Sequence, residues 1–253
     1  LAAGLFISAV AIGAIFTSSL NTPKAHAANN ANFKAGNIMS DATMSNKNAM
    51  SVQQIQAFLD SKNKCNNTNT YLAAQYPQVS YSIKNGKFVC MAQESFNGQS
   101  AAQLIWQASQ DYSINPQVLI VLLEKEQGLI SDTWPNSRQY KTATGYGCPD
   151  TAACDSQYFG LNNQIRRSAS LFRGVLNGGW SNYPVGQTYV QYNPNAACGG
   201  SVVNIQNRAT SALYRYTPYQ PNQSALNAGY GTGDGCGAYG NRNFWAMFTD
   251  WFG

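Results

Sequence analysis

Ionisable side chains are scarce in this sequence of 253 residues, and histidine is nearly absent. Charged residues make up 11% of the chain, and His26 is the only histidine. His26 lies in an N-terminal segment that we expect to be removed, so the mature chain would contain no imidazole. Ser-His-Asp catalysis, Cys-His catalysis and ordinary His-ligated zinc sites are then excluded. No metal or organic cofactor is indicated. The net charge of +5 is not gathered into Lys/Arg clusters, so nucleic acid is not an expected partner.

The start of the chain is typical of an export signal. Sixteen apolar, uncharged residues open the sequence, and Ala25-His26-Ala27 fits the small-x-small pattern of a cleavage site. Sixteen residues are short for a membrane span, which needs about 20. We therefore expect residues 1–27 to be a signal peptide and the mature protein to be secreted, cell-wall associated and free of the membrane. An uncleaved membrane anchor is the alternative.

Six cysteines in an exported chain predict disulfide bonds. Their spacing favours three local bridges, which join Cys65 with Cys90, Cys148 with Cys154, and Cys198 with Cys236. A thiolate nucleophile is the competing interpretation, but it lacks a histidine or a flanking cationic cluster.

The patterns along the chain predict an α+β, mainly helical fold in two parts. Residues 28–97 read as a small accessory module with a helix over 51–62 and a hairpin over 81–90, which turns at Asn85-Gly86. Residues 98–253 read as a catalytic domain. Helices are expected in this domain over 100–113, 115–127, 161–176, 208–217 and 241–252, with a second hairpin over 188–206. We expect a monomer.

Only three glutamates occur, and two of them, Glu124 and Glu126, end the same predicted helix. On a helix, Glu126 lies over the leucines three, four and seven positions before it, while Glu124 faces the polar side. A carboxyl group against leucines is costly unless it is hydrogen-bonded, paired or protonated. A protonated carboxyl is what a general acid needs to cleave a glycosidic bond. The alternative is a buried glutamate capped by backbone amides.

The segment "INPQVLIVLLEKEQGLI" resembles the catalytic helix of the lysozyme-like clan, especially lytic transglycosylases and goose-type lysozymes. Asn115-Pro116, the apolar run and Glu126-Gln127-Gly128 occupy the places of that motif, with Gln127 where the clan usually has serine. The resemblance implies a lysozyme-like domain in which Glu126 is the catalytic acid/base.

Shorter matches extend this resemblance. "YFGLNNQI" and Tyr192-Asn193 resemble the clan's "GLMQ" and "AYN" segments, which would place Gln164 and Tyr192 near the sugar. "AQESFNG" around Glu94 resembles the clan's "ES" pair, but it follows a hairpin instead of a long apolar helix, so we prefer Glu126. Much of the chain is also similar to a group of secreted bacterial proteins, largely actinobacterial or from small-genome candidate lineages.

The long polar loop after the Glu126 helix supplies the remaining candidate residues. Asp150 and Asp155 are candidates for the second carboxylate that a hydrolase needs, or else they are turn residues. Lytic transglycosylases work with one glutamate, and a chain poor in carboxylates favours that scheme. Tyr146, Tyr158 and Trp134 either stack on sugar faces or pack internally.

Together these patterns predict a peptidoglycan-cleaving glycosidase or lytic transglycosylase that acts on the MurNAc–GlcNAc backbone. Its partner would be peptidoglycan or another cell-wall glycan. An endo-glucosaminidase that cuts the other glycosidic bond is one alternative. A non-catalytic surface protein that binds glycans or adheres to a partner cell is the other.

Overall fold

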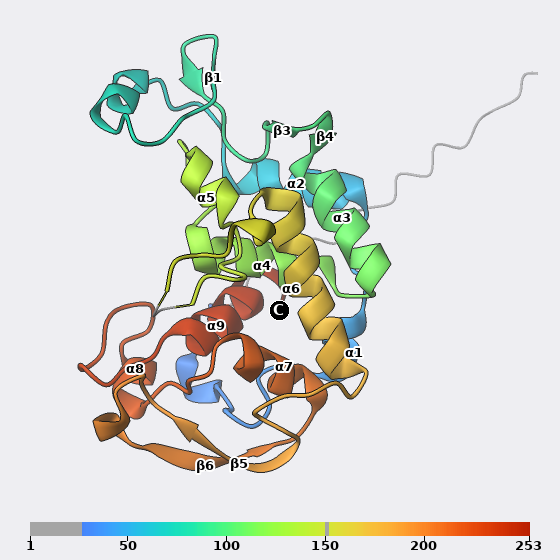
Figure 1. Cartoon of the computed structure of the whole chain (residues 1–253), viewed down its shortest axis with the longest axis vertical. Helices are drawn as coiled ribbons and strands as arrows, with labels where there is room; N and C mark the ends of the chain where they lie inside the picture. The colour runs from blue at the N-terminus through green and yellow to red at the C-terminus, as the bar shows by residue number, and fades with distance from the viewer. Residues whose placement is uncertain (1–26, 150–151) are drawn as a thin grey trace, which may run out of the picture.

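The computed structural model describes residues 27–149 and 152–253, and helices dominate this part of the chain (Figure 1). The α-helices are α1 (Asp41–Ser45), α2 (Val52–Lys62), α3 (Ala101–Tyr112), α4 (Pro116–Gln127), α5 (Ser137–Lys141), α6 (Leu161–Leu176), α7 (Arg208–Tyr216), α8 (Gln223–Asn227) and α9 (Gly240–Phe252). The 3-10 helices are η1 (Asn30–Asn32), η2 (Thr70–Gln75), η3 (Ser156–Tyr158) and η4 (Ala196–Cys198). The prediction of a mainly helical α+β fold is confirmed. The expected signal peptide lies outside the described residues except for Ala27.

Three short antiparallel hairpins complete the architecture of the described residues. Their strands are β1 (Ile83–Lys84) with β2 (Lys87–Phe88), β3 (Ser95–Phe96) with β4 (Gln99–Ser100), and β5 (Gly186–Gln191) with β6 (Gly200–Ile205). The first turns at Asn85-Gly86, where both residues have positive φ, as the sequence predicts. The β5–β6 hairpin lies at the opposite end of the molecule from β1 (Figure 1).

Helix α4 begins and ends where the sequence predicts. The Asn115 side chain accepts a hydrogen bond from the Gln117 N–H, Pro116 occupies the first turn, and Gly128 closes the helix in the left-handed conformation. These local signals fix the bounds of α4, and therefore the position of Glu126 in its last turn.

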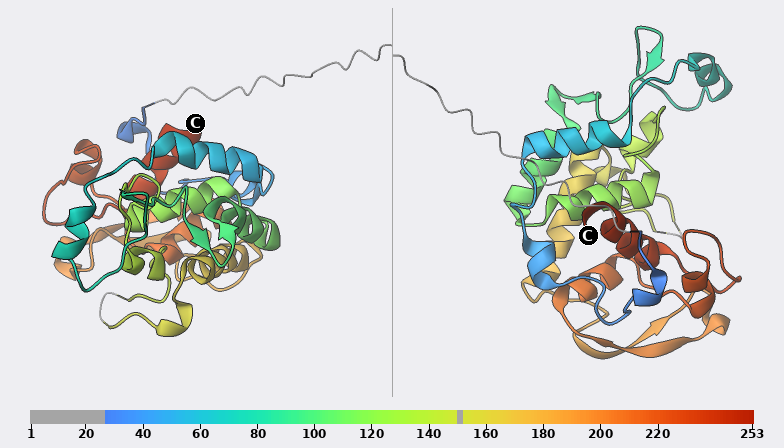
Figure 2. Two further views of the ribbon diagram at one scale, coloured as in Figure 1. Left: turned by 90° about the horizontal axis from the view of Figure 1, so that it is seen from above. Right: turned by 180° about the vertical axis from the view of Figure 1, so that it is seen from behind.

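The prediction of a single apolar stripe on α4 is wrong. Residues 118–123 of α4 are buried without interruption, because α3, α6 and α9 pack around the helix (Figures 1 and 2). A helix that is apolar on all sides belongs in the middle of a core. Glu124 and Glu126 thus lie together on the turn where α4 emerges from the core, and both are half-buried.

Residues 28–97 share this core and do not pack as a separate module. Met44, Ile55 and Leu59 belong to the same buried cluster as the residues of α3 and α4. Backbone hydrogen bonds also connect the two parts: the Asn115 N–H donates to the Met44 carbonyl oxygen at 2.8 Å. The segment that contains α1 reads as polar in the sequence, yet its Met44 is part of the core.

All three predicted disulfides are present. They join Cys65 to Cys90, Cys148 to Cys154, and Cys198 to Cys236. The Cys65–Cys90 bridge ties the loop after α2 to the end of the first hairpin. In the described ranges, none of the helices has the length and apolar character that a membrane crossing requires.

Candidate carboxylate sites

Glu126 is half-buried and has a cationic partner. Its side chain is 25% exposed, and Oε1 forms an ion pair with Nζ of Lys125, whose own side chain is only 8% exposed. The sequence predicts that the Glu126 carboxyl group lies against leucines. In the structure it contacts the Lys125 ammonium group. Because a buried ammonium group needs a counter-ion, Glu126 also has a structural role beside Lys125.

Helix α7 completes the surroundings of this pair. Lys125 Nζ donates to Oγ1 of Thr217 at 3.2 Å and lies 5.7 Å from the ring centroid of Tyr216. The Tyr216 hydroxyl donates to the Thr144 carbonyl oxygen. Burial raises the pKa of Tyr216 well above its usual range, and the charge of Glu126 adds to this effect. Lys125 and Tyr216 were not expected from the sequence, since nothing in its local pattern brings α7 to α4.

The loop over residues 142–147 faces the Glu126 carboxyl. A Cβ atom at Gly145 would lie 3.6 Å from Oε2 of Glu126, so the loop backbone and the carboxyl are close neighbours. Gln164 of α6 holds this loop in place. Its side-chain oxygen accepts from the N–H groups of Thr144 and Tyr146, and its amide N–H₂ donates to the Tyr146 and Tyr158 carbonyl oxygens.

Gln164 therefore supports the site without touching a ligand. Its side chain is fully buried, at 0% exposure, and both of its polar ends are hydrogen-bonded to the protein. The predicted contact between Gln164 and a sugar is corrected accordingly.

Tyr146 and Tyr158 lie together beside this loop. Their rings meet edge to face, with centroids 4.9 Å apart and an interplanar angle of 85°. Gly147 makes this pairing possible, because a Cβ atom there would come within 2.3 Å of the Tyr158 ring. Tyr146 is half-buried and flanks the Gly145 position that faces Glu126. Of the predicted aromatic residues, Tyr146 is therefore next to Gly145 in the chain, and Tyr158 is in contact with Tyr146.

The other predicted residues occupy different places. Trp134 stacks on Tyr81 with centroids 5.7 Å apart and also packs against Phe88, so it belongs to an aromatic cluster around the first hairpin. Tyr192 follows β5 and donates its backbone N–H to the Gly199 carbonyl oxygen. The position of Trp134 matches the packing interpretation, and the predicted contact of Tyr192 with a sugar stays a prediction.

Of the two aspartates predicted as a second carboxylate, Asp155 has a structural role. Asp155 caps η3: its carboxylate accepts hydrogen bonds from the backbone N–H and the side-chain amide of Gln157. These bonds lower the pKa of Asp155 below its usual range. This is the turn role that the sequence left open. Asp150 lies outside the described residues.

Glu124 has a structural role at the end of α4. Its carboxylate accepts hydrogen bonds from the N–H groups of Ile130 and Ser131, at 3.0 and 3.1 Å, and from the Ser131 hydroxyl at 2.6 Å. It therefore fixes the chain reversal after α4. The sequence places Glu124 on the polar side of the helix but does not reveal this role.

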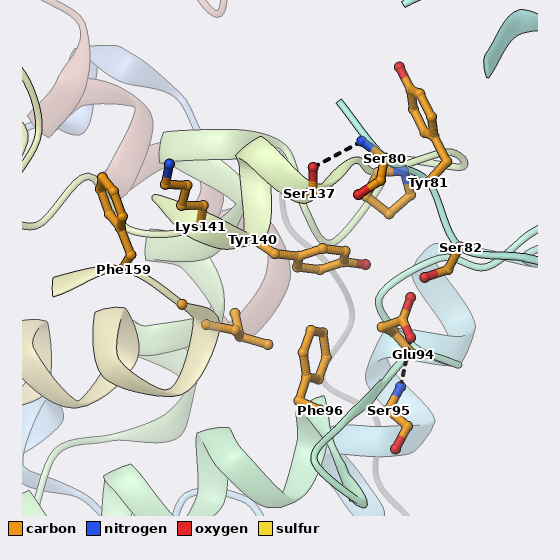
Figure 3. A pocket seen from close by; sticks show the side chains of 13 residues that line it. Ser80, Tyr81, Ser82, Glu94, Ser95, Phe96, Ser137, Tyr140, Lys141 and Phe159 are labelled. Atoms are coloured by element: carbon orange, nitrogen blue, oxygen red, sulfur yellow. Dashed lines mark hydrogen bonds between the residues drawn. The ribbon is translucent and has the colours of Figure 1, made fainter. Parts of the chain in front are cut away.

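Glu94, which the sequence interpretation set aside, lines a cavity of about 560 Å³ (Figure 3). We name this the Glu94 cavity and define it by Ser82, Glu94, Phe96, Tyr140, Lys141 and Phe159. Oε1 of Glu94 accepts from the Ser95 N–H at 3.1 Å, but Oε2 is buried without a partner in the described part of the chain. The Tyr140 hydroxyl is buried without a partner there as well. Burial, and next the charge of Glu94, raises the pKa of Tyr140 above its usual range.

Over residues 27–149 and 152–253, no group of three or more His, Cys, Asp or Glu side chains could hold a metal ion. Comparison with known families gives a match over most of the chain: residues 37–253 match the model of the family described as LasA, N-terminal domain. The chain belongs to this family. No curated protein and no solved structure matches the chain.

Membership in the LasA N-terminal domain family corrects the resemblance to the lysozyme-like clan. LasA is a staphylolytic protease of the M23 peptidase type, and not a lysozyme-like glycosidase. The lysozyme-like motif covered only one helix and its flanks, whereas the family match covers most of the chain. The three disulfides and the family relationship together indicate an exported protein.

Proposed function

We propose that this member of the LasA N-terminal domain family acts outside the cell on the bacterial wall, where it cleaves the glycan backbone of peptidoglycan. Glu126 is the general acid/base of this proposal, and the MurNAc–GlcNAc backbone is the substrate. One observation carries it: Glu126 lies at the end of helix α4, whose middle is buried, and its side chain is 25% exposed beside a loop fixed by Gln164.

The two oxygens of Glu126 have different surroundings, and this difference supports a catalytic role. Oε1 is paired with Lys125, which orients the carboxyl group, while Oε2 faces the backbone at Gly145. A glycan strand lying along this loop would pass the Glu126 carboxyl group on the side of Oε2. Tyr146 offers a ring beside the same loop for stacking on a sugar face.

The proposed reaction needs only one carboxyl group. Glu126 gives its proton to the glycosidic oxygen as the C1–O bond breaks, and the leaving sugar departs as an alcohol. A hydroxyl group of the retained sugar, or a water molecule, then forms the new bond to C1 and returns its proton to Glu126. Attack by the sugar hydroxyl gives an anhydro-sugar, and attack by water gives a free reducing end.

A second function is favoured by a specific contact. Because Lys125 is buried, Glu126 is its counter-ion, and that need alone explains a carboxylate at this position. The site would then bind wall glycan through the loop and its tyrosines without cleaving it. The two functions differ in whether the Glu126 carboxyl group is required once the protein is folded.

The test is the cleavage of purified peptidoglycan by the Glu126→Gln variant. Loss of a general acid/base lowers the rate by about 100- to 10,000-fold, so zymography on wall material should show no clearing. Glu124→Gln is the matched control, since it changes a carboxylate in the same helical turn that has only a structural role. Retained clearing by Glu126→Gln, or wall binding with no clearing by the wild type, contradicts the enzymatic proposal.

Glu126→Gln also leaves the Lys125 ammonium group without its counter-ion, which destabilises the fold by several kcal/mol, about 3 to 5. A double variant, Lys125→Met with Glu126→Gln, removes both charges and separates the two effects. We expect it to be folded, as judged by circular dichroism, and inactive. A folded double variant that still clears the wall would assign the cleavage to another residue.

A further inference from the structure

We propose that the Glu94 cavity binds a short zwitterionic peptide, with the peptide ammonium group at Glu94 and the peptide carboxylate at Lys141. Neither the family match nor the glycan-cleavage proposal assigns a role to this cavity. Its volume of about 560 Å³ falls within the range of small-molecule binding pockets, roughly 300–1,000 Å³.

The cavity has opposite charges at its two ends (Figure 3). Glu94 and Ser82 lie at one end, and Lys141 lies at the other, where its Nζ is 4.2 Å from the Phe159 ring centroid. A neutral sugar would leave both charged groups without a partner of opposite sign. A zwitterionic peptide provides a cation for one end and an anion for the other, so charge complementarity favours the peptide.

Two buried polar atoms on residues that line the cavity lack partners in the described part of the chain, and both suit a peptide. Oε2 of Glu94 is an acceptor without a donor, which an ammonium group supplies. The Tyr140 hydroxyl is a donor without an acceptor, which a peptide carbonyl oxygen supplies. Buried polar groups are normally hydrogen-bonded, so two such atoms on the wall of one cavity indicate a ligand that satisfies both.

The apolar middle and the rim of the cavity are already in place. Phe96 and Tyr140 meet edge to face, with centroids 5.0 Å apart, between the two charged ends. At the rim, the Ser137 N–H donates to the Ser80 carbonyl oxygen at 2.8 Å, and the Ser80 N–H donates to the Ser137 hydroxyl at 3.0 Å. A preformed wall lowers the entropic cost of binding a small ligand.

The test is calorimetric titration of the full chain with three peptides: tri-alanine, N-acetyl tri-alanine and tri-alanine amide. The acetyl and amide groups remove the ammonium and carboxylate charges one at a time. Each charged contact is worth about 10- to 100-fold in affinity. The wild type should therefore bind free tri-alanine at least about tenfold more tightly than either blocked peptide.

Single substitutions identify which end of the cavity binds the peptide ammonium group and which end binds the peptide carboxylate. Glu94→Gln should abolish the preference for free over N-acetylated peptide and keep the preference over the amide. Lys141→Gln should do the reverse. Lys87→Gln, which changes an exposed lysine of β2 outside the cavity, is the control and should keep both preferences.

Several results would overturn the peptide proposal. Equal affinity for free and blocked peptides, no binding of tri-alanine at millimolar concentration, or binding of N,N′-diacetylchitobiose in its place would each do so. If Glu94→Gln fails to fold, the exposed Lys141 still tests the carboxylate end. These peptides contain no glycosidic bond, so the outcome is independent of whether Glu126 cleaves glycans.

Discussion

Glu126 and Glu94 are two half-buried glutamates in contrasting surroundings. The Glu126 carboxylate has a buried ammonium partner and lies beside a loop that is held by a fully hydrogen-bonded glutamine. The Glu94 carboxylate has one satisfied oxygen and one buried oxygen without a partner, in a cavity that also holds an unpartnered tyrosine hydroxyl. The Glu126 carboxylate thus has its charged partner in the free protein, whereas one oxygen of the Glu94 carboxylate has no partner in the described part of the chain.

This contrast separates two kinds of functional site. A carboxyl group that is fixed by protein contacts can act on a bond that is brought to it, because its position does not depend on the ligand. A buried acceptor without a donor costs stability in the free protein and regains it when a ligand supplies the donor. We therefore assign chemistry to Glu126 and binding to Glu94.

The largest stability effect is expected at Gln164, because this residue makes the Glu126 site rigid. Gln164→Leu would keep the size of the side chain but remove the hydrogen-bond partner of two N–H groups and one carbonyl oxygen of the loop, and of the Tyr158 carbonyl oxygen. We expect a loss of about 4 kcal/mol in the free energy of unfolding and a matching fall in wall cleavage.

Urea denaturation measures the loss in the free energy of unfolding of Gln164→Leu. The rate of wall solubilisation measures the fall in cleavage. The Glu94 cavity serves as the internal reference, since Gln164 does not line it. Stability within about 1 kcal/mol of the wild type would mean that the loop is held by other contacts.

Glu124→Gln sharpens the comparison within one helical turn. It weakens the hydrogen bonds to Ile130 and Ser131, which should lower the free energy of unfolding by about 2 kcal/mol. The cleavage rate per folded molecule should not change. A large loss of rate in well-folded Glu124→Gln protein would transfer the catalytic role to Glu124.

Tyr140→Phe should have the smallest effect, and of the opposite sign. It removes a buried hydroxyl without a partner, which should stabilise the free protein by about 1 kcal/mol. The same change should weaken tri-alanine binding, because the peptide loses a hydrogen-bond donor. Stability and binding would thus move in opposite directions.

The alkaline limb of the stability curve gives a second measurement on the same variant. Burial raises the pKa of Tyr140 in the folded state, whereas an unfolded tyrosine ionises near pH 10. The unfolded chain therefore loses this proton first. As a result, ionisation of Tyr140 does not affect the free energy of unfolding of the wild type below about pH 10 and lowers it above that pH. In urea melts, the advantage of Tyr140→Phe over the wild type should grow as the pH passes 10. An advantage that does not change with pH would mean that Tyr140 is not shielded from water.

Local signals predicted much of the fold. The capping box of α2, the Asn115-Pro116 start and Gly128 end of α4, and the Asn85-Gly86 turn are each set by neighbouring residues, and all are confirmed. The three disulfides were predicted because each joins cysteines that are near in sequence. The helix α1, by contrast, has only Met44 as a buried residue and little apolar pattern, so the sequence did not reveal it.

The sites were less predictable because they depend on long-range contacts. Periodicity placed Glu126 over leucines, but α9, which lies far along the chain, packs against α4, and residues 118–123 of this helix are all buried. The Lys125–Glu126 pair gains its character from burial beneath Tyr216, which a local pattern cannot show. Glu94 was rejected because it follows a hairpin, yet that hairpin brings it into a cavity with Tyr140. The resemblance to the lysozyme-like clan depended on one helix and its flanks, so it took a family match over most of the chain to correct the family assignment.

The most direct test of the central claim is mass spectrometry of the fragments that the protein releases from purified peptidoglycan. The account predicts fragments with new glycan ends at the MurNAc–GlcNAc linkage, as anhydro-sugars or free reducing ends, that disappear with the Lys125→Met, Glu126→Gln double variant. Fragments whose glycan strands are intact and whose cuts lie only in the peptides would contradict the assignment of chemistry to Glu126.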